Sequence, residues 1–246
     1  MNKENVHKLT NGLKFLFRGF SAISSDKSLW KWALIPVLID LALLIFVFFS
    51  SLDLVGSIVT TGLSFIFSST SGLLYSLLYY PLYLILYVAF VVMAIYLVYI
   101  IGSVIASPFN SFIAEKILMN RGLIKEQPFE LGRWLKLSLR MLGISLVRAL
   151  IFIFFGLFLF IFSFLPGVNI VTSFLAFIII AFDNMDYSYE AAGLGLSDRF
   201  NHLKNNTFLF SGMGVVIGAT LLIPGLTLLV MPLMVAGCAD SYNSTK

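Results

Sequence analysis

Asp40 lies inside a long apolar run, where a carboxyl group is an unusual and chemically informative side chain. A charge at the centre of a membrane helix costs about 3 kcal/mol on insertion scales, so such a group faces protein or water, or carries a proton. In a transporter this carboxyl group would bind a coupling proton. In a structural role it would fix the packing of two helices through a hydrogen bond, and the sequence leaves both interpretations open.

Arg148, Asp183 and Asp186 border a second apolar run, the first residue before it and the other two at its end. Ionisable residues at such positions either line a path for ions or anchor helix ends at the membrane interface. Arg148 is therefore a candidate for lining a pore or coupling ion movement. Interface anchoring is the alternative for all three residues.

The other reactive residue types give little support for enzyme chemistry. Cys238 is the one cysteine, and His7 and His202 are far apart, which predicts neither a disulfide nor a Cys- or His-based metal site. No glycine-rich phosphate loop with a lysine is present, and no spacing of Ser, His and Asp indicates a catalytic triad. We expect a protein that is not an enzyme and that uses no cofactor or metal.

The composition indicates the class of protein. Hydrophobic residues make up 59% of the 246 positions and charged residues 11%, whereas a soluble domain has roughly 45–50% and about 25%. So few charges cannot cover a soluble surface. We therefore expect an all-α integral membrane protein, with residues 1–246 forming a single membrane domain in contact with the lipid bilayer.

The basic residues are strongly clustered. All 16 Lys and Arg residues lie in four blocks, at 3–31, 116–148, 199–204 and the last residue. Such clustering is the positive-inside pattern of a multi-pass membrane protein and places these blocks on the cytoplasmic side. It argues against nucleic acid as a partner, because no basic face on a soluble surface is visible.

The elements that position these residues begin with an amphipathic helix within residues 1–31. Its apolar residues recur at helical spacing, at Val6, Leu9, Leu13, Leu16, Phe17, Phe20 and Ile23. Such a helix can lie in the headgroup region, with lysine side chains reaching toward water. The alternative is an ordinary helix that docks on the rest of the protein.

Two long helices are expected within residues 32–106. The first span runs from about Trp32 to Ser50, near the roughly 20 residues that cross a bilayer, and residues 51–72 are expected to form an interfacial helix and loop. The second apolar stretch, 73–106, exceeds one span. Its first half carries tyrosines that suit a membrane interface, namely Tyr75, Tyr79, Tyr80, Tyr83 and Tyr87.

A basic region follows at residues 107–148 and is expected to begin as a loop at Ser107. Arg133, Lys136 and Arg140 lie on one helical face, and much of the remaining surface of that segment is apolar. This pattern predicts a basic amphipathic helix at the cytoplasmic membrane surface.

Two Pro-Gly dipeptides each divide a pair of apolar arms. Pro166-Gly167 lies within residues 149–183 and Pro224-Gly225 within 207–240, with a polar connector at 184–206 between the pairs. Pro-Gly signals a turn, and an arm of about 16 residues is about 24 Å long, short of a ~30 Å bilayer core. Each pair is expected to be a helical hairpin that enters the bilayer and turns back, or spans a thinned membrane. The two pairs form either an internal repeat or a chance similarity.

Several short motifs then point to a known family. The most specific is Ala106-Ser107-Pro108-Phe109-Asn110, followed by Glu115. The others are Arg18-Gly19-Phe20 with Ile35-Pro36, Asp186-Tyr187 with Ser188 where proline is usual, and the C-terminal Ile223-Pro224, Met231-Pro232 and Ala236-Gly237. Taken in their order along the chain, these motifs cover nearly all of it and resemble those of the CysZ sulfate permease and etoposide-induced protein family.

The resemblance implies two long transmembrane helices plus two hemi-penetrating helical hairpins, assembled as homo-oligomers. It also implies transport of sulfate or a related oxyanion across a bacterial inner membrane, which supplies sulfur for cysteine biosynthesis. A structural or lipid-interacting membrane protein of the same fold that has lost sulfate binding is the alternative.

The family's sulfate motif precedes the first span and reads Gly-Leu/Ile-Arg-Arg, and the matching stretch here is Ser28-Leu29-Trp30-Lys31. Ser28 can donate a backbone N–H and a hydroxyl to an anion. Lys31 keeps one positive charge but lacks the two-pronged guanidinium, and Lys27 is placed to compensate. The resemblance thus makes Lys27, Ser28, Leu29 and Lys31 the candidate oxyanion-binding residues.

Overall fold

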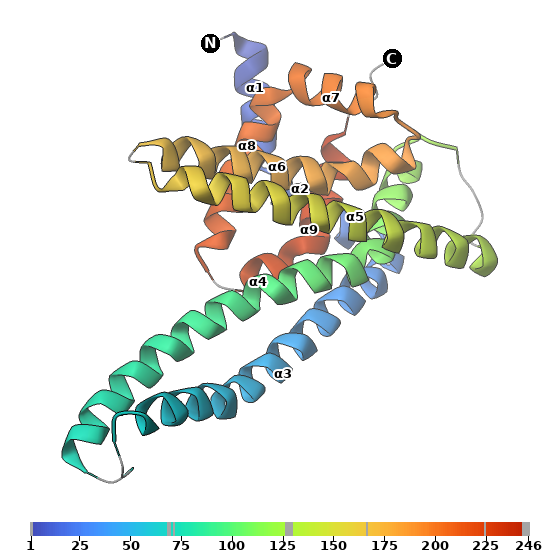
Figure 1. Cartoon of the computed structure of the whole chain (residues 1–246). Helices are drawn as coiled ribbons and strands as arrows, with labels where there is room; N and C mark the ends of the chain where they lie inside the picture. The colour runs from blue at the N-terminus through green and yellow to red at the C-terminus, as the bar shows by residue number, and fades with distance from the viewer. Residues whose placement is uncertain are drawn as a thin grey trace. The chain divides into compact units, whose positions relative to one another are not determined.

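The computed structural model describes residues 2–67, 70, 72–125, 130–165, 167–223 and 225–242, without the side chains at 131, 133, 134, 137, 138, 141, 144, 145, 148, 149, 152 and 163. Every regular element in these ranges is a helix, which confirms the all-α class (Figure 1). The helices are α1 (Lys3–Leu13), α2 (Phe15–Ser25), α3 (Ser28–Ser64), α4 (Leu73–Asn120), α5 (Leu131–Ser163), α6 (Val168–Ala191), α7 (Leu196–Asn205), α8 (Thr207–Leu221) and α9 (Leu226–Ser241).

The chain divides into two units. The smaller unit, here called the hairpin unit, is residues 38–101 and holds most of α3 with the first part of α4. The larger unit, here called the body unit, comprises residues 1–37 and 102–246. It therefore contains the remaining helices, the N-terminal end of α3 and the C-terminal end of α4.

A ladder of tyrosines packs the hairpin unit. The rings of Tyr75, Tyr79, Tyr83 and Tyr87 stack in sequence along α4, with centroids 5.6, 5.9 and 5.8 Å apart. Residues four apart lie on one helical face, which is why the spacing of these tyrosines produces a stack. Val55, Val59 and Leu63 of α3 are buried in the same cluster. The tyrosines therefore pack the two helices of this unit together.

The separate interfacial helix expected after Ser50 is not present in the described residues, because α3 continues without a break to Ser64. Its serine and threonine hydroxyls bond to carbonyls three or four residues earlier, as Ser51 does to Phe48 and Thr60 to Gly56. Those bonds keep polar side chains inside a helix. Packing of the valine face against the tyrosine ladder then stabilises the added turns.

The loop expected to begin at Ser107 was also wrong, since α4 continues through Pro108 to Asn120. Ile113, Ala114 and Ile117 are buried on this last part of the helix. They join residues of α2, α6 and α9 in one cluster of the body unit. Burial of this apolar face outweighs the local preference of Ser-Pro for a turn.

Two pairs of glycines bring the N-terminal helices onto the last hairpin. Gly12 of α1 faces Gly212 of α8, and Gly19 of α2 faces Gly237 of α9. A Cβ at Gly12 would lie only 2.9 Å from the backbone nitrogen of Met213, and one at Gly19 only 2.8 Å from that of Gly237. Residues 1–31 therefore contain α1 and α2, docked on α8 and α9, and the first residues of α3, rather than one amphipathic helix at the membrane surface.

Both expected turns are present. Gly167 and Gly225 each have φ of 81°, and each directly precedes a helix. A left-handed conformation of this kind favours glycine, because it has no Cβ. Pro166 and Pro224 lie outside the described residues.

The two helical pairs differ more in length than the repeat predicts. Helices α8 and α9 have 15 and 16 residues, whereas α5 and α6 have 33 and 24. The basic segment that was expected at the membrane surface is continuous with α5, and α6 continues past Asp183 to Ala191. Burial of Asn184, Tyr187 and Ser188 explains why α6 does not end with its apolar run.

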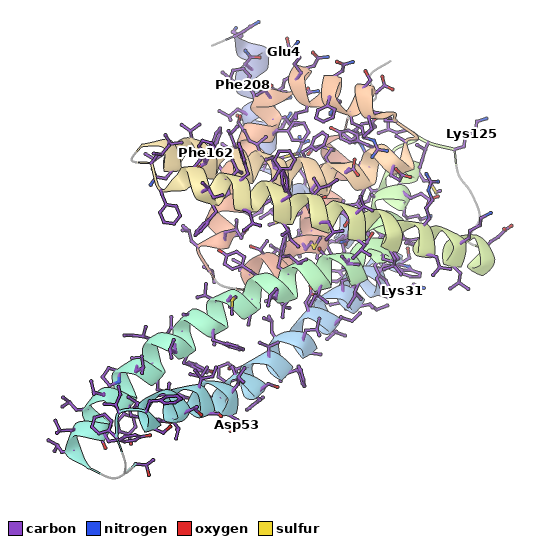
Figure 2. The ribbon with its side chains drawn as sticks, viewed as in Figure 1. Glu4, Lys31, Asp53, Lys125, Phe162 and Phe208 are labelled. Carbon is purple, nitrogen blue, oxygen red and sulfur yellow. The ribbon has the colours of Figure 1, made fainter. Side chains whose placement is uncertain are left out.

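Within the described residues, α3, α4 and α6 are long and apolar enough to cross a membrane. Helices α8 and α9 are apolar but shorter, at about 22–24 Å. Apolar side chains cover much of the surface of the long helices, as Figure 2 shows. Such a surface requires lipid or protein against it.

Candidate functional site

The turn between α2 and α3 carries the candidate oxyanion residues. Helix α2 ends at Ser25 and α3 begins at Ser28, so Asp26 and Lys27 make the connection. The backbone N–H of Leu29 donates to the Asp26 carbonyl at 2.9 Å, and that of Ser28 donates to Asp26 Oδ1 at 3.0 Å. The first N–H groups of a helix have no partners within it and favour negative charge. Asp26 therefore caps the start of α3.

The four candidate residues have different environments. Leu29 is 0% exposed and belongs to the buried cluster with Ile23 and Val235, so its side chain packs and does not face a ligand. Lys27, Ser28 and Lys31 are exposed. Lys31, labelled in Figure 2, places Nζ 5.5 Å from the centre of the Trp32 ring. The turn thus presents two lysines and one helix start to the surrounding medium.

The end of α4 joins this turn. Asn120 Nδ2 donates to Asp26 Oδ2 at 3.1 Å, and the Lys116 charge lies close enough to stabilise the Asp26 carboxylate. Lys116 and Asn120 are one helical turn apart, so one face of α4 serves both contacts. Sequence reasoning missed Asp26, Lys116 and Asn120 as members of the site. Only the Glu115 motif beside Lys116 hinted at this segment.

The Asp26 carboxyl group is ionised at neutral pH. A side-chain hydrogen bond from Ser28 lowers its pKa below the ordinary 3.8, and the Asn120 amide, the Ser28 N–H and the Lys116 charge add to this, while partial burial opposes it. The turn therefore holds a carboxylate beside Lys27 and Lys116. We call Asp26, Lys27, Ser28, Lys31, Lys116 and Asn120 the α3-start site.

Asp40 and Arg148 were the candidates for ion coupling or for lining a pore. Asp40 is 1% exposed on α3, and its Oδ1 has no hydrogen-bond partner among the described residues. The packing hydrogen bond expected under the structural interpretation is therefore not seen for this oxygen. The side chain of Arg148 lies outside the described residues.

A second charged cluster connects α6 with α7. Arg199 donates to Asp186 Oδ1 at 2.6 Å, to Glu190 Oε2 at 2.8 Å and, through Nε, to the Leu194 carbonyl at 2.9 Å. Burial lowers the pKa of Arg199, but the bonds to Glu190 and Asp186 outweigh it and raise the pKa above its ordinary value. Arg140 of α5 also pairs with Glu190, at 3.2 Å. Asp186 of the Asp-Tyr motif is thus an anchor between helices.

The other motif residues are mostly packing residues. Pro36, Pro108, Asn110, Tyr187, Pro232 and Gly237 are buried. Phe109 and Glu115 are half-buried, and the Phe109 ring lies 6.1 Å from that of Trp32. Asn110 has no hydrogen-bond partner for either amide atom among the described residues. Pro224 is outside the described residues.

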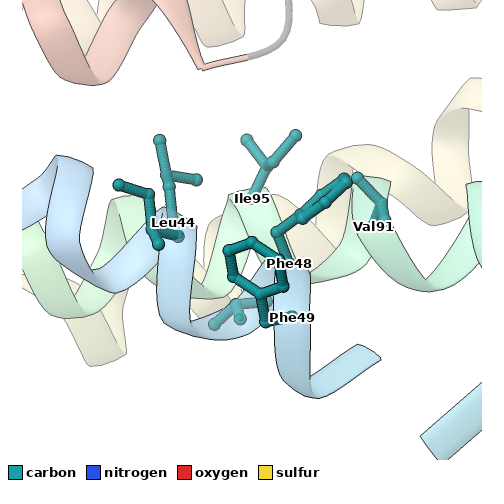
Figure 3. A pocket seen from close by; sticks show the side chains of 7 residues that line it. Leu44, Phe48, Phe49, Val91 and Ile95 are labelled. Atoms are coloured by element: carbon teal, nitrogen blue, oxygen red, sulfur yellow. The ribbon is translucent and has the colours of Figure 1, made fainter. Parts of the chain in front are cut away.

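A groove in the hairpin unit is lined by apolar side chains. It has a volume of about 250 Å³, and Figure 3 shows five of its seven lining side chains with labels. The lining residues are Leu44, Ile45, Val47, Phe48, Phe49, Val91 and Ile95. These walls offer an oxyanion no donor, which leaves the α3-start site as the better candidate.

Comparison with known proteins bears directly on this site. A family model described as sulfate transporter CysZ/etoposide-induced protein 2.4 matches residues 15–232. The chain belongs to this family. All six residues of the α3-start site fall within the part of the chain that matches the CysZ/etoposide-induced family.

Several curated relatives in the CysZ/etoposide-induced family are bacterial proteins named sulfate transporter CysZ. That of Pseudomonas aeruginosa strain PAO1 is 30% identical over 142 residues, covering 56% of this chain and 58% of the relative. That of Pseudomonas fluorescens strain Pf0-1 is 34% identical over 149 residues, covering 56% and 57%. The chain therefore spans less than two thirds of the length of these relatives.

Proposed function

We propose that this protein is a membrane permease for sulfate or a related oxyanion and supplies sulfur for cysteine biosynthesis. The observation that carries this proposal is the α3-start site, where a helix start and the Lys116 charge stabilise a carboxylate, and where the exposed Lys27 and Lys31 lie on the same turn and the first turn of α3. An anion is what such a site stabilises. Membership of the family and the names of its bacterial relatives support sulfate as that anion.

The site suits a transported anion better than a tightly held one. Lysine ammonium groups attract a tetrahedral dianion as point charges, without the paired hydrogen bonds of an arginine fork. Ser28 adds a hydroxyl and a backbone N–H at the start of α3. Conduction requires binding that is strong enough to admit the ion and weak enough to release it. Lysines on an exposed turn meet that condition.

The membrane arrangement that we propose has α3 and α4 as long transmembrane helices. The α5–α6 and α8–α9 pairs would enter as helical hairpins, and among the described residues of these four helices α6 is long and apolar enough to span. With the basic blocks cytoplasmic, the protein would be a multi-pass component of the bacterial inner membrane. We further propose that it works as a homo-oligomer, which would cover part of the exposed apolar surface of the long helices.

The membrane potential opposes the entry of sulfate, so net uptake needs a further source of free energy. Moving a dianion into a negative-inside cell costs about 4.6 kcal/mol per 100 mV, twice the roughly 2.3 kcal/mol for one charge. Accumulation therefore requires a coupled ion or rapid consumption of sulfate inside. Asp40 is the residue that we propose for proton coupling, since it is buried within a long apolar helix and its Oδ1 has no partner among the described residues.

The test is uptake of radiolabelled sulfate into liposomes that contain the purified protein. We expect uptake above that of protein-free liposomes, and competition by unlabelled sulfate and sulfite. A folded, inserted protein that gives no uptake at any sulfate concentration would contradict the permease function.

A further inference from the structure

The anion position at the start of α3 is already occupied by a group of the protein itself. Ser28 N donates to Asp26 Oδ1 at 3.0 Å, and Asn120 Nδ2 donates to Asp26 Oδ2 at 3.1 Å. Both carboxylate oxygens are therefore engaged, one by each of two helices. The donor that an incoming oxyanion would use at this helix start is the same N–H that Asp26 uses.

An oxyanion and the Asp26 carboxylate cannot both occupy this position. One N–H group makes one well-aligned hydrogen bond, and two anions that share the same few ångströms repel each other. Lys116 also stabilises whichever negative charge lies there, and in this structure that charge is on Asp26. Binding of an oxyanion at this helix start therefore requires displacement of the Asp26 side chain.

We propose that Asp26 is an internal competitor that determines the affinity and charge selectivity of the oxyanion site. The proposal rests on the permease function proposed above. When the site is empty, the Asp26 carboxylate bonds to the helix start and offsets part of the positive charge of Lys116. An arriving oxyanion replaces the carboxylate, and the carboxylate replaces the oxyanion again when it leaves.

The exposure of the residues permits this exchange. Asp26 is half-buried, and Lys27 and Ser28 are exposed, so an ion reaches the turn from solution. Displacement of the carboxylate requires rotation of one short side chain and loss of its bonds to Ser28 and Asn120. The buried side chain of Leu29 keeps the backbone of the turn in place during this rotation.

The exchange selects for charge. A monovalent anion that replaces a carboxylate gains no net attraction to the lysines, whereas a dianion brings one more negative charge than the group it replaces. We therefore expect a dianionic oxyanion to displace Asp26 more effectively than chloride or nitrate does.

Two substitutions of Asp26 distinguish the effect of its negative charge from the effect of its side chain accepting the Ser28 N–H. Asp26→Asn keeps an oxygen that can accept the Ser28 N–H and removes the negative charge, while Asp26→Ala removes both. Asparagine is as good a helix cap as aspartate, so the first variant keeps the turn intact even where the second loses stability. Asp53→Asn is the matched control, because Asp53 is an exposed carboxylate in the hairpin unit.

The measurement is equilibrium binding of radiolabelled sulfate to the purified full-length protein, with chloride and nitrate as competitors. We expect Asp26→Asn to bind sulfate about 10-fold more tightly than wild type, and chloride to compete more effectively in the variant. The control variant should bind sulfate as wild type does.

Equal sulfate affinity in wild type and both Asp26 variants would overturn the competitor role while leaving the permease function intact. Weaker binding in Asp26→Asn would also overturn it, since Asp26 would then support the site. Absence of sulfate binding in wild type and in every variant, together with absent liposome uptake, would instead show that the proposed function itself is wrong.

Discussion

The Asn120 amide donates a hydrogen bond to Asp26 Oδ2 at 3.1 Å and so joins two residues that are 94 positions apart in the chain. This contact brings the last turn of α4 to the start of α3. Leu29, in the stretch that matches the sulfate motif, and Ala114, next to Glu115, are also buried in one cluster of the body unit. The candidate site therefore has residues from two segments, the start of α3 and the end of α4. The sulfate motif identifies only the start of α3.

The lysines of the α3-start site should contribute to transport in proportion to their charge. We expect the double substitution Lys27→Gln and Lys31→Gln to lower sulfate uptake about 10-fold, because two positive charges near the anion are lost. Uptake into liposomes is the measurement, with size-exclusion chromatography to verify assembly. Lys125→Gln is the control, since this exposed lysine, labelled in Figure 2, is outside the site. Unchanged uptake in the double variant would refute the assignment of Lys27 and Lys31.

The glycine contacts between α1 and α8 should be intolerant of a methyl group. Gly212→Ala would place a Cβ 2.9 Å from the backbone nitrogen of Leu13, so the two helices must separate. We expect a loss of about 1–3 kcal/mol of stability, measured as a lower thermal midpoint in detergent. Gly62→Ala is the control, because among the described residues no atom other than those of the adjacent helix backbone lies within 4 Å of its Cβ position. A Gly212→Ala midpoint equal to wild type would mean that α1 is not docked in this way.

The Arg199 cluster should be a major source of stability for the junction of α6 and α7. The Arg199 side chain is 13% exposed, and its loss would remove the buried cation that bonds to both Asp186 and Glu190, leaving only the exposed Arg140 pair at Glu190. We expect Arg199→Gln to cost about 3 kcal/mol of unfolding free energy.

The matched comparison is Arg140→Gln. Its side chain is 65% exposed, so the loss of its pair with Glu190 should cost less than about 1 kcal/mol. Thermal unfolding of both variants distinguishes the two contributions. Similar losses for the two arginines would show that burial does not strengthen the Arg199 pairs.

The stability contributed by Asp26 should depend on pH in a defined direction. Its pKa in the folded protein is below the ordinary value of 3.8, so the ionised form is favoured by folding. The contribution is complete above pH 3.8 and disappears as the pH falls through the lowered folded-state value. Thermal midpoints of wild type and Asp26→Asn, measured from pH 7 downward, should therefore converge below pH 3.8. A difference that persists unchanged at the lowest pH would contradict an ionised Asp26 as its source.

Asp40 should be required for proton-driven uptake and dispensable for folding. Its Oδ1 has no partner among the described residues, so Asp40→Asn removes the proton-binding group without removing a hydrogen bond at that atom. We expect sulfate uptake to lose its response to an inward proton gradient while uptake down a sulfate gradient continues. Asp53→Asn, which changes an exposed carboxylate, should leave both intact. A proton response that survives in Asp40→Asn would exclude Asp40 from coupling.

Local patterns in the chain predicted a large part of the fold. The excess of apolar residues indicates the membrane class, and runs of them indicate long helices. The dipeptides ending in Gly167 and Gly225 predicted both turns, because glycine adopts the left-handed conformation that each turn requires. These features depend on a few neighbouring residues, which is why sequence alone was sufficient for them.

Packing between distant segments decided where the helices end. Residues 51–72 were expected to form a separate interfacial helix and loop, but the tyrosine ladder covers Val55 and Val59 and stabilises the continuation of α3. A loop was expected to begin at Ser107, but burial of Ile113 and Ile117 kept that segment helical. Hydropathy averaged along the chain does not include the partner that covers a helix face.

The charged contacts likewise came from tertiary structure. The sequence by itself determined that Lys27, Ser28 and Lys31 lie together at one turn, since they are neighbours in the chain. Only the folded structure brought Lys116 and Asn120 to Asp26 and placed Arg199 between Asp186 and Glu190. The physical reason is that each of these contacts closes a loop of the chain, and its formation depends on the helices between the partners packing first.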